Sequence, residues 1–271
     1  MLLSAAVIAA VAIARGCDGF APPTPSIHKV SSATRSTLFA DKDKDSKERG
    51  TLQSSEEWLN KAIQSTLDKG GFDESSFCIG ILGDLHIDPR KMEDYQVGKD
   101  HWQPIFNAAK KAHGNTALIS LGDLGESKNC DHNEENPSEL FAGTTICHEM
   151  AAEYLSSFGV PYEVIGGNHD LEGIDEFTTD EANLEVFMKL HGKPTAQFVR
   201  EIADKTILIG LGSTVFREAP YTSHEVIIDQ GQIDWFENYL KEHPADDGWK
   251  IFVFTHAPPN GSGLRVIQVS V

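Results

Sequence analysis

The feature that most constrains this 271-residue chain is a series of short, continuous apolar runs separated by longer amphipathic segments. A run without polar alternation is typical of a strand that is buried on both faces. We expect strands at 77–82, 116–121, 162–165, 206–211 and 250–254, and a short edge strand at 224–228. Strands of this kind, alternating with helices along the chain, predict an α/β fold whose sheet is covered on both faces.

Between the predicted strands, apolar residues recur at helical spacing. We expect helices at 104–113, 137–158 and 232–243, another that begins at Asp180, and a first helix that begins near Ser54. The folded domain should therefore start at about residue 54, because the preceding segment has no apolar face.

Four polar blocks follow four of the apolar runs directly. They contain Asp84 and His86, then Asp123, then Asn168, His169 and Asp170, and finally His256. In open α/β sheets, functional side chains gather at the carboxyl ends of the strands, so we expect these blocks to meet.

Carboxylate, imidazole and amide groups in these blocks suit two divalent metal ions. Asp84 and His86 are close enough in sequence to reach one ion, and Asp123 could give one oxygen to each of two ions. Asn168 and His256 complete a predicted ligand set that suits manganese, iron and zinc alike. Such a pair of ions would activate a bridging hydroxide and hold a phosphoryl oxygen.

The predicted catalytic residues are His169 and Asp170. His169 follows a predicted ligand directly and could project toward a leaving group as a general acid or transition-state donor. Asp170 or Glu126 could orient the imidazole. The other histidines have no partner motif, and we expect them at the surface or at helix ends.

These blocks resemble the calcineurin-like metallophosphoesterase pattern of Asp-x-His, Gly-Asp-x-x-[Asp/Glu], Gly-Asn-His-[Asp/Glu], a lone His and Gly-His-x-His. The match covers about residues 77–260. The resemblance implies a two-sheet sandwich flanked by helices, a dinuclear metal site and phosphoester hydrolysis. It further implies that Asp123 and Asn168 are metal ligands and that His169 is catalytic. The Gly- and Asn-containing loop at 255–263 is similar to the loop that follows the lone His.

The sequence departs from the pattern in one respect, because it contains no Gly-His-x-His. In the family that block supplies one imidazole to each ion, so we expect weaker metal binding here. The final apolar run at 264–271 reads as an incomplete domain. The first hypothesis is a phosphoric ester hydrolase acting on a phosphate mono- or diester, with reduced activity. The alternative is a non-catalytic truncated form that binds phosphate or a partner, and a third is a hydrolase of another substrate class.

The net charge of −18 limits the partners. An acidic surface repels nucleic-acid backbones and anionic membranes. We therefore expect a small phosphorylated substrate, no nucleic acid, and metal ions as the local positive charge. The four cysteines form no disulfide framework. Cys130 and Cys147 could still pair, or join His132 and His148 in a small metal site. Oligomeric state is not indicated.

The N-terminal 53 residues predict targeting rather than catalysis. Residues 1–19 fit a signal peptide, because their apolar stretch is too short to span a membrane. Residues 20–53 form a transit-peptide-like segment and a solvated linker, ahead of the domain at 54–271. The leader resembles the two-part plastid leader of algae with secondary plastids, which implies a plastid protein with no membrane segment in its mature form. A plain secretory signal, giving a secreted or endomembrane protein, is the alternative.

Overall fold

The computed structural model describes residues 11–14, 61, 74–112, 114–127, 140–217 and 226–257. The chain divides into one unit of residues 1–14 and 74–271 and a second unit of residues 15–73. Lys61, which is helical, is the only described residue of the second unit, so the following architecture is that of the first. Several predicted features lie outside the described residues. They are the transit segment, most of the helix from Ser54, the residues Cys130 and His132, and the run at 264–271.

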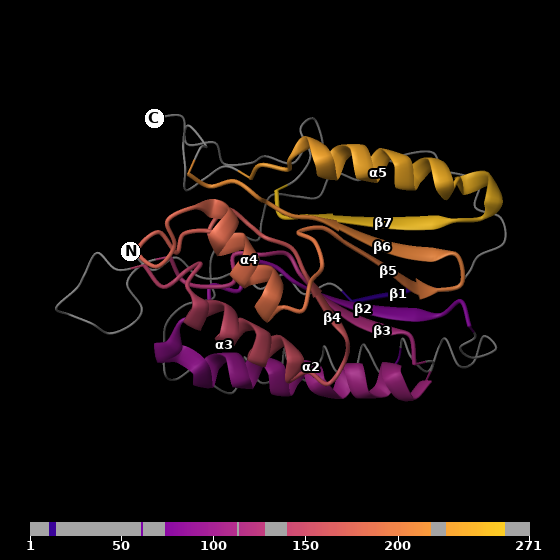
Figure 1. The fold of residues 1–271 in the computed structure, drawn as a ribbon. Helices are drawn as coiled ribbons and strands as arrows, with labels where there is room; N and C mark the ends of the chain where they lie inside the picture. Colours follow the sequence, from indigo (N-terminus) through magenta and orange to yellow (C-terminus); the bar gives the residue numbers. More distant parts are fainter. Residues whose placement is uncertain are drawn as a thin grey trace, which may run out of the picture. The chain divides into compact units, whose positions relative to one another are not determined.

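Two sheets form the centre of the first unit (Figure 1). The first has the order β1-β2-β3-β4 and comprises β1 (Val11–Ala14), β2 (Phe77–Leu82), β3 (Thr116–Ser120) and β4 (Tyr162–Val164). The second has the order β5-β6-β7 and comprises β5 (Phe198–Ala203), β6 (Thr206–Leu211) and β7 (Lys250–Thr255). β2, β3 and β4 are parallel, and so are β6 and β7, whereas β1 and β5 are antiparallel to their neighbours. The carboxyl ends of the parallel strands in each sheet therefore lie together.

The two sheets pack face to face across a shared apolar core. Phe77 and Ile119 of the first sheet join Phe198, Leu208 and Phe254 of the second in one buried cluster. Every residue of β3 and β6 is buried, as the continuous apolar runs predict. Each large apolar side chain buried in this way contributes about 1.5–3 kcal/mol, so the interface between the sheets is a main source of stability.

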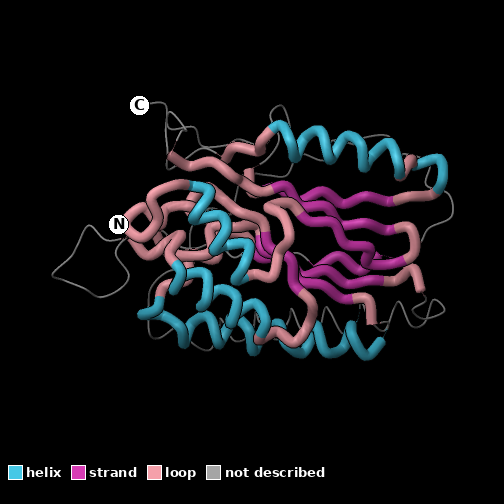
Figure 2. Tube along the Cα trace, in the orientation of Figure 1, coloured by secondary structure: helices cyan, strands magenta, loops and turns pink. Residues whose placement is uncertain are grey.

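Helices cover the outer face of each sheet (Figures 1 and 2). The helices are α2 (Met92–Ala112), α3 (Thr145–Ser156), α4 (Asp180–Leu190) and α5 (Gln230–Glu242), with short 3-10 helices at Pro89–Lys91 and Ala245–Asp247. Phe106 of α2, Leu155 of α3 and Phe187 of α4 pack on the first sheet, whereas Trp235 and Tyr239 of α5 pack on the second. The predicted fold class, an α/β two-sheet sandwich flanked by helices, is confirmed.

Two helices differ from their predicted bounds by more than two residues. α2 begins well before 104 and contains Pro104 in its interior, so the proline did not mark a helix start. α3 begins later than predicted, because Thr144 is its N-cap and accepts a hydrogen bond from the Cys147 N–H at 3.2 Å. Gly143 just before it has a φ of 75°, which breaks helical geometry.

Two strand predictions also need correction. β5 was missed because its Phe-Val-Arg-Glu-Ile-Ala sequence is not continuously apolar; Arg200 lies in it and pairs with Glu163 of β4, with Nη2 and Oε1 at 2.7 Å. Residues 226–229 form no strand, and within them Asp229 instead caps α5 by accepting from the Gln232 N–H.

Of the histidines that we expected at the surface or at helix ends, His148 is in neither place and His191 is at a helix end but buried. His148 on α3 has no exposed area, and His191, which does end α4, is 9% exposed. Cys147 beside them is also buried, and Cys130, with which it could pair, lies outside the described residues.

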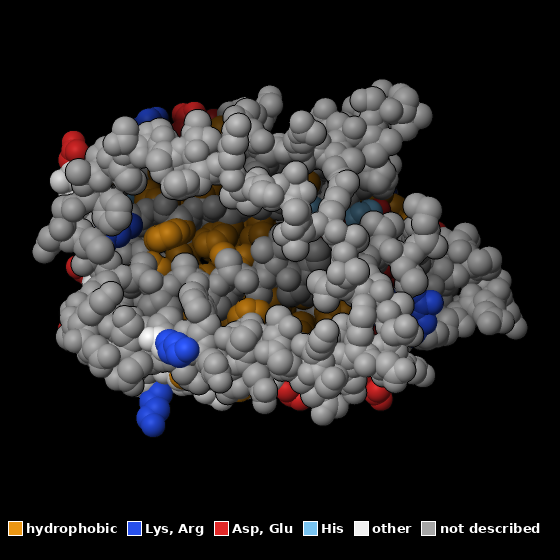
Figure 3. All heavy atoms as spheres, turned by 180° about the vertical axis from the view of Figure 1, so that it is seen from behind, with side chains coloured by type: hydrophobic (Ala, Val, Ile, Leu, Met, Phe, Trp, Pro, Cys, Tyr) orange, Lys and Arg blue, Asp and Glu red, His pale blue; other side chains and the backbone are white. Residues whose placement is uncertain are grey.

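None of the described helices combines the length and apolar character needed to cross a membrane. On the face seen in Figure 3, the visible hydrophobic side chains gather in the middle, with charged side chains toward the margins. Partly exposed apolar residues of the second sheet include Phe252 and Val253 of β7, at 36% and 45%. Loops collect at one end of the strands (Figure 2), and this end contains the polar blocks.

Candidate metal centre

All four polar blocks lie at the carboxyl ends of strands from both sheets. Asp84 and His86 follow β2, Asp123 follows β3, Asn168 and His169 follow β4, and His256 follows β7. The first two loops are bound to each other, because the His86 N–H donates to the Asp123 carbonyl at 2.8 Å and Ile87 forms a bridge with Gly125. The sandwich thus gathers residues that are far apart in the sequence.

The backbone of two site residues is strained. His86 and Asp123 have φ values of 41° and 49°, in the left-handed region that non-glycine residues rarely adopt. Such residues cost on the order of 1–3 kcal/mol each and cluster at functional sites. The loops also approach so closely that a Cβ on Gly167 would overlap Asp123 Oδ1 and lie 2.8 Å from His256 Nδ1. Only glycine at 167 allows these two side chains to meet.

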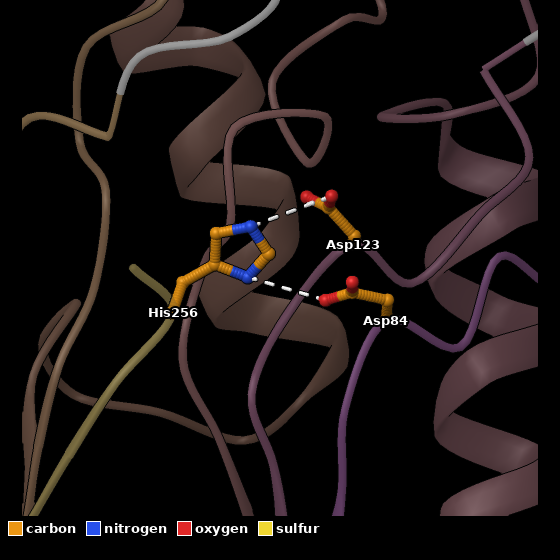
Figure 4. Close-up of side chains that lie close together, drawn as sticks. All are labelled: Asp84, Asp123 and His256. Carbon is orange, nitrogen blue, oxygen red and sulfur yellow. Dashed lines mark ion pairs between the residues drawn. The ribbon is translucent and has the colours of Figure 1, made fainter. Parts of the chain in front are cut away.

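Three residues form the centre of the site (Figure 4). Asp84, Asp123 and His256 each place a ligand atom within 4.8 Å of the others. His256 Nε2 is 3.4 Å from Asp123 Oδ2, and His256 Nδ1 is 3.7 Å from Asp84 Oδ1. The Asp123 side chain is 6% exposed but that of Asp84 is 57% exposed, so the cluster opens to solvent on the Asp84 side.

Asp123 is the common neighbour of three imidazoles. Its Oδ1 accepts a hydrogen bond from the His169 N–H at 3.0 Å. Its Oδ2 lies 3.8 Å from His86 Nε2, 3.9 Å from His169 Nε2 and 3.4 Å from His256 Nε2. His256 Nε2 is also 2.9 Å from Asn168 Oδ1, so the amide joins the same group. Two predicted ligands, His86 and His256, and the predicted catalytic His169 therefore surround one buried carboxylate oxygen.

The Nδ1 atom of each imidazole has an acceptor partner. His86 Nδ1 is 3.3 Å from the Gly125 carbonyl oxygen, and His256 Nδ1 is 2.8 Å from the Leu121 carbonyl oxygen. A carbonyl only accepts, so for His86 this contact places the proton on Nδ1 and leaves the Nε2 lone pair for a metal ion. His256 has an acceptor at both ring nitrogens, the Leu121 carbonyl at Nδ1 and Asn168 Oδ1 at Nε2. The oxygen and nitrogen donors, held in this way, fit the divalent ions that the sequence predicts.

His169 differs from the other two because its Nδ1 partner is charged. Nδ1 donates to Glu172 Oε1 at 2.7 Å. Burial by itself would lower the pKa of His169, but the Glu172 hydrogen bond and the negative charges of Asp123, Glu172 and Asp170 outweigh it and raise the pKa to about 9. A protonated imidazole cannot bind a metal and can donate a proton, which suits an acid rather than a ligand.

Asp170 does not contact the His169 ring as we expected. Its carboxylate is buried and accepts hydrogen bonds from the Asp123, Leu124 and Gly167 N–H groups at 2.8, 2.8 and 2.7 Å. Burial raises the pKa of Asp170. The structure gives Asp170 a role in tying the second and third loops together, and gives the contact with the imidazole to Glu172.

The sequence analysis missed Glu172 and the two backbone carbonyl groups. Glu172 lies three residues after His169, in a turn where the Glu172 N–H donates to the His169 carbonyl at 3.2 Å. That spacing was the available signal, since a turn brings residues i and i+3 together. No sequence signal marks the Leu121 and Gly125 carbonyls, because any residue type supplies one.

Fold and site together define a metal-dependent phosphoesterase domain. The calcineurin-like phosphoesterase model matches residues 78–268, and the chain belongs to this family. Among solved structures, the chain is similar to a dimetal phosphatase from Danio rerio, LOC 393393, at 12% identity and a TM-score of 0.46. The similarity covers 67% of this chain and 70% of that chain. No curated protein matches the sequence.

Proposed function

We propose that this chain hydrolyses a small phosphate mono- or diester with the help of two divalent metal ions. The observation that supports this most directly is the convergence of three imidazole Nε2 atoms on Asp123 Oδ2, all within 3.9 Å. Family membership supports the reaction class. The assignment of the metal ligands and of the proton donor depends on the residues around Asp123 Oδ2.

Five residues would hold the ions: Asp84, His86, Asp123, Asn168 and His256. Manganese, iron and zinc all accept this mixture of oxygen and nitrogen donors. When bound, the ions supply positive charge that polarises a phosphoryl oxygen and activates water. The same charge would offset the acidic character of the protein, whose net charge is −18, toward an anionic substrate.

His169 would act as the proton donor. Its Nδ1 proton is held by Glu172, so Nε2 faces the Asp123 carboxylate and the neighbouring site. In the metal-free chain the pKa of His169 is raised to about 9, so Nε2 holds a proton near neutral pH. It would donate this proton to the oxygen that leaves as the phosphoester bond breaks. The Asp123 carboxylate, fixed through Oδ1 by the His169 N–H, stabilises the protonated ring.

Asp123→Asn tests the proposal. Loss of the charge at the centre of the site should abolish manganese uptake in calorimetry and hydrolysis of p-nitrophenyl phosphate and bis-p-nitrophenyl phosphate. Asp175→Asn removes a charge from an exposed residue and should change neither quantity. Wild-type turnover that survives in Asp123→Asn would refute the assignment.

A second candidate function is a binding role for the same site. In this alternative the chain binds metal and phosphate, or a partner, without turnover. Calorimetry with manganese and then with inorganic phosphate distinguishes the two, because the alternative predicts binding of both and no product from either aryl ester.

Delivery to a plastid is part of the same proposal. Its support is the two-part leader at residues 1–53, with its apolar stretch and its transit-like segment. A fluorescent protein fused behind residues 1–53 should enter the plastid of a secondary-plastid alga. Fluorescence in the endomembranes or the medium would favour the secretory alternative.

A further inference from the structure

Glu172 is a buried carboxylate with an unusual set of contacts. Its side chain is 5% exposed, and Oε1 accepts from His169 Nδ1 at 2.7 Å. Among the described residues, Oε2 makes no hydrogen bond. A buried acceptor without a partner costs stability, so the loop alone gives no reason for a carboxylate here. Its one hydrogen-bond partner instead points to a function through His169.

We propose that Glu172 is a positioning residue that holds the Nδ1 proton of His169 and sets the orientation of its ring. A carboxylate only accepts, so the contact requires the proton on Nδ1 and directs Nε2 toward Asp123 Oδ2, 3.9 Å away. This inference depends on the proposed function only for the catalytic consequence, because the orientation itself is a property of the folded chain.

Asp170, the neighbouring carboxylate, cannot fill this role in the observed geometry. Its two oxygens accept three backbone N–H groups, from Asp123, Leu124 and Gly167. Rotating the Asp170 side chain toward the imidazole would leave these buried donors without an acceptor, at about 1–3 kcal/mol for each. The geometry therefore separates two tasks, with Asp170 joining the loops and Glu172 orienting the ring.

Glu172 is itself held from two sides. Asn183 of α4, which has no exposed area, donates from Nδ2 to the Gly143 carbonyl at 2.6 Å and accepts at Oδ1 from the Gly173 N–H at 3.1 Å. Gly143 lies so close that a Cβ there would be 2.5 Å from the Glu172 nitrogen. The loop before α3 and the body of α4 thus fix the Glu172 backbone, as a precise positioning contact requires.

Kinetics of Glu172→Ala, Glu172→Gln and Asp175→Asn test the catalytic consequence. Glu172→Ala should lower kcat on the order of 100-fold, with KM and manganese affinity changed less than about twofold, because His169 is not a ligand. Glu172→Gln keeps a carbonyl oxygen that can accept from Nδ1 and should recover a large part of that loss. Asp175→Asn, a matched loss of charge on the same loop, should match the wild type.

A double variant shows whether Glu172 acts through the imidazole. Adding Glu172→Ala to His169→Ala should cause no further loss, because the ring that Glu172 orients is already absent. Additive losses, or an effect of Glu172→Ala no larger than that of Asp175→Asn, would overturn the proposal.

A spectroscopic readout tests the orientation without any turnover. Long-range proton–nitrogen correlation of the metal-free protein, recorded at a pH at which the His169 ring is neutral, should show the His169 signal, identified by its loss in His169→Ala, with the proton on Nδ1. That signature should persist in Glu172→Gln and disappear in Glu172→Ala; if Glu172→Ala does not fold, Glu172→Leu provides the same comparison. An unchanged signature in the apolar variant contradicts the inference. If the chain shows no turnover but the His169 signal changes with the Glu172 variants as expected, the proposed function is refuted and the positioning role of Glu172 is not.

Discussion

Asp170→Asn is the change that best separates architecture from chemistry in this site. The Asp170 carboxylate, 1% exposed, joins the Asp123 loop to the Gly167 loop through three backbone N–H groups. Oδ2 accepts from Asp123 and Gly167, and Oδ1 accepts from Leu124. An asparagine has one oxygen and one amide nitrogen, so it can keep at best the two contacts of Oδ2.

The expected loss follows from the third contact. The asparagine NH₂ would face the Leu124 N–H, leaving a buried donor without an acceptor at about 1–3 kcal/mol, and the two remaining bonds would lose their ionic character. We expect the free energy of unfolding to fall by about 2–4 kcal/mol, leaving a folded protein if its stability is typical. Since Asp123 is held by the same bonds, manganese affinity should fall on the order of tenfold to 100-fold.

Urea denaturation followed by circular dichroism measures the stability of Asp170→Asn, and calorimetry measures its manganese affinity. Both quantities should fall together. A variant with wild-type stability and wild-type metal affinity that has lost turnover would refute this reasoning, because it would give Asp170 a direct part in the reaction.

Two other features lead to further predictions. Gly167→Ala should weaken manganese binding at least about tenfold, because its Cβ would overlap Asp123 Oδ1. The control is Gly98→Ala, whose Cβ would meet open space and which should bind manganese like the wild type. Equal manganese affinities of the two variants in calorimetry would contradict this prediction. Burial is the largest cause that lowers the pKa of His148 to about 4 and of His191 to about 3. Above about pH 6.5 both histidines are neutral in the folded and in the unfolded state. As the pH falls below that value, only the unfolded state binds protons, so the free energy of unfolding falls. At pH 5 the loss is about 2 kcal/mol for each histidine. Urea denaturation at pH 7.5 and 5.0 should show a smaller difference in His191→Gln than in the wild type, and an equal difference would count against the assignment.

The continuous apolar runs predicted β2, β3, β4, β6 and β7, although most of β7 is not buried. The runs at 77–82 and 206–211 are observed with the predicted bounds, because a strand covered on both faces must be apolar throughout. β5 escaped prediction because Arg200 and Glu201 interrupt its apolar pattern. Its inward charge is satisfied by Glu163 of the other sheet, and no local pattern shows that partner.

The sequence predicted that the residues of the four polar blocks would lie together, but not the contacts among them. Asp84, Asp123 and His256 could be chosen because polar residues directly after buried strands meet at one edge of the sheet. The orienting contact was assigned to Asp170 or Glu126, whereas the structure gives it to Glu172. Asp170 and Glu172 are only two positions apart in one turn, and the sequence alone does not show which of their carboxylates faces the His169 ring.

The sequence by itself determined which chemical groups stand at the ends of the strands, since the order of apolar runs and polar blocks requires it. Only the tertiary structure decided how those groups divide their work. The Leu121 and Gly125 carbonyls lie at Nδ1 of His256 and His86, whereas the Glu172 carboxylate lies at Nδ1 of His169. The physical reason is that a tautomer or a charge depends on the nearest acceptor, and folding alone brings that acceptor within hydrogen-bonding distance.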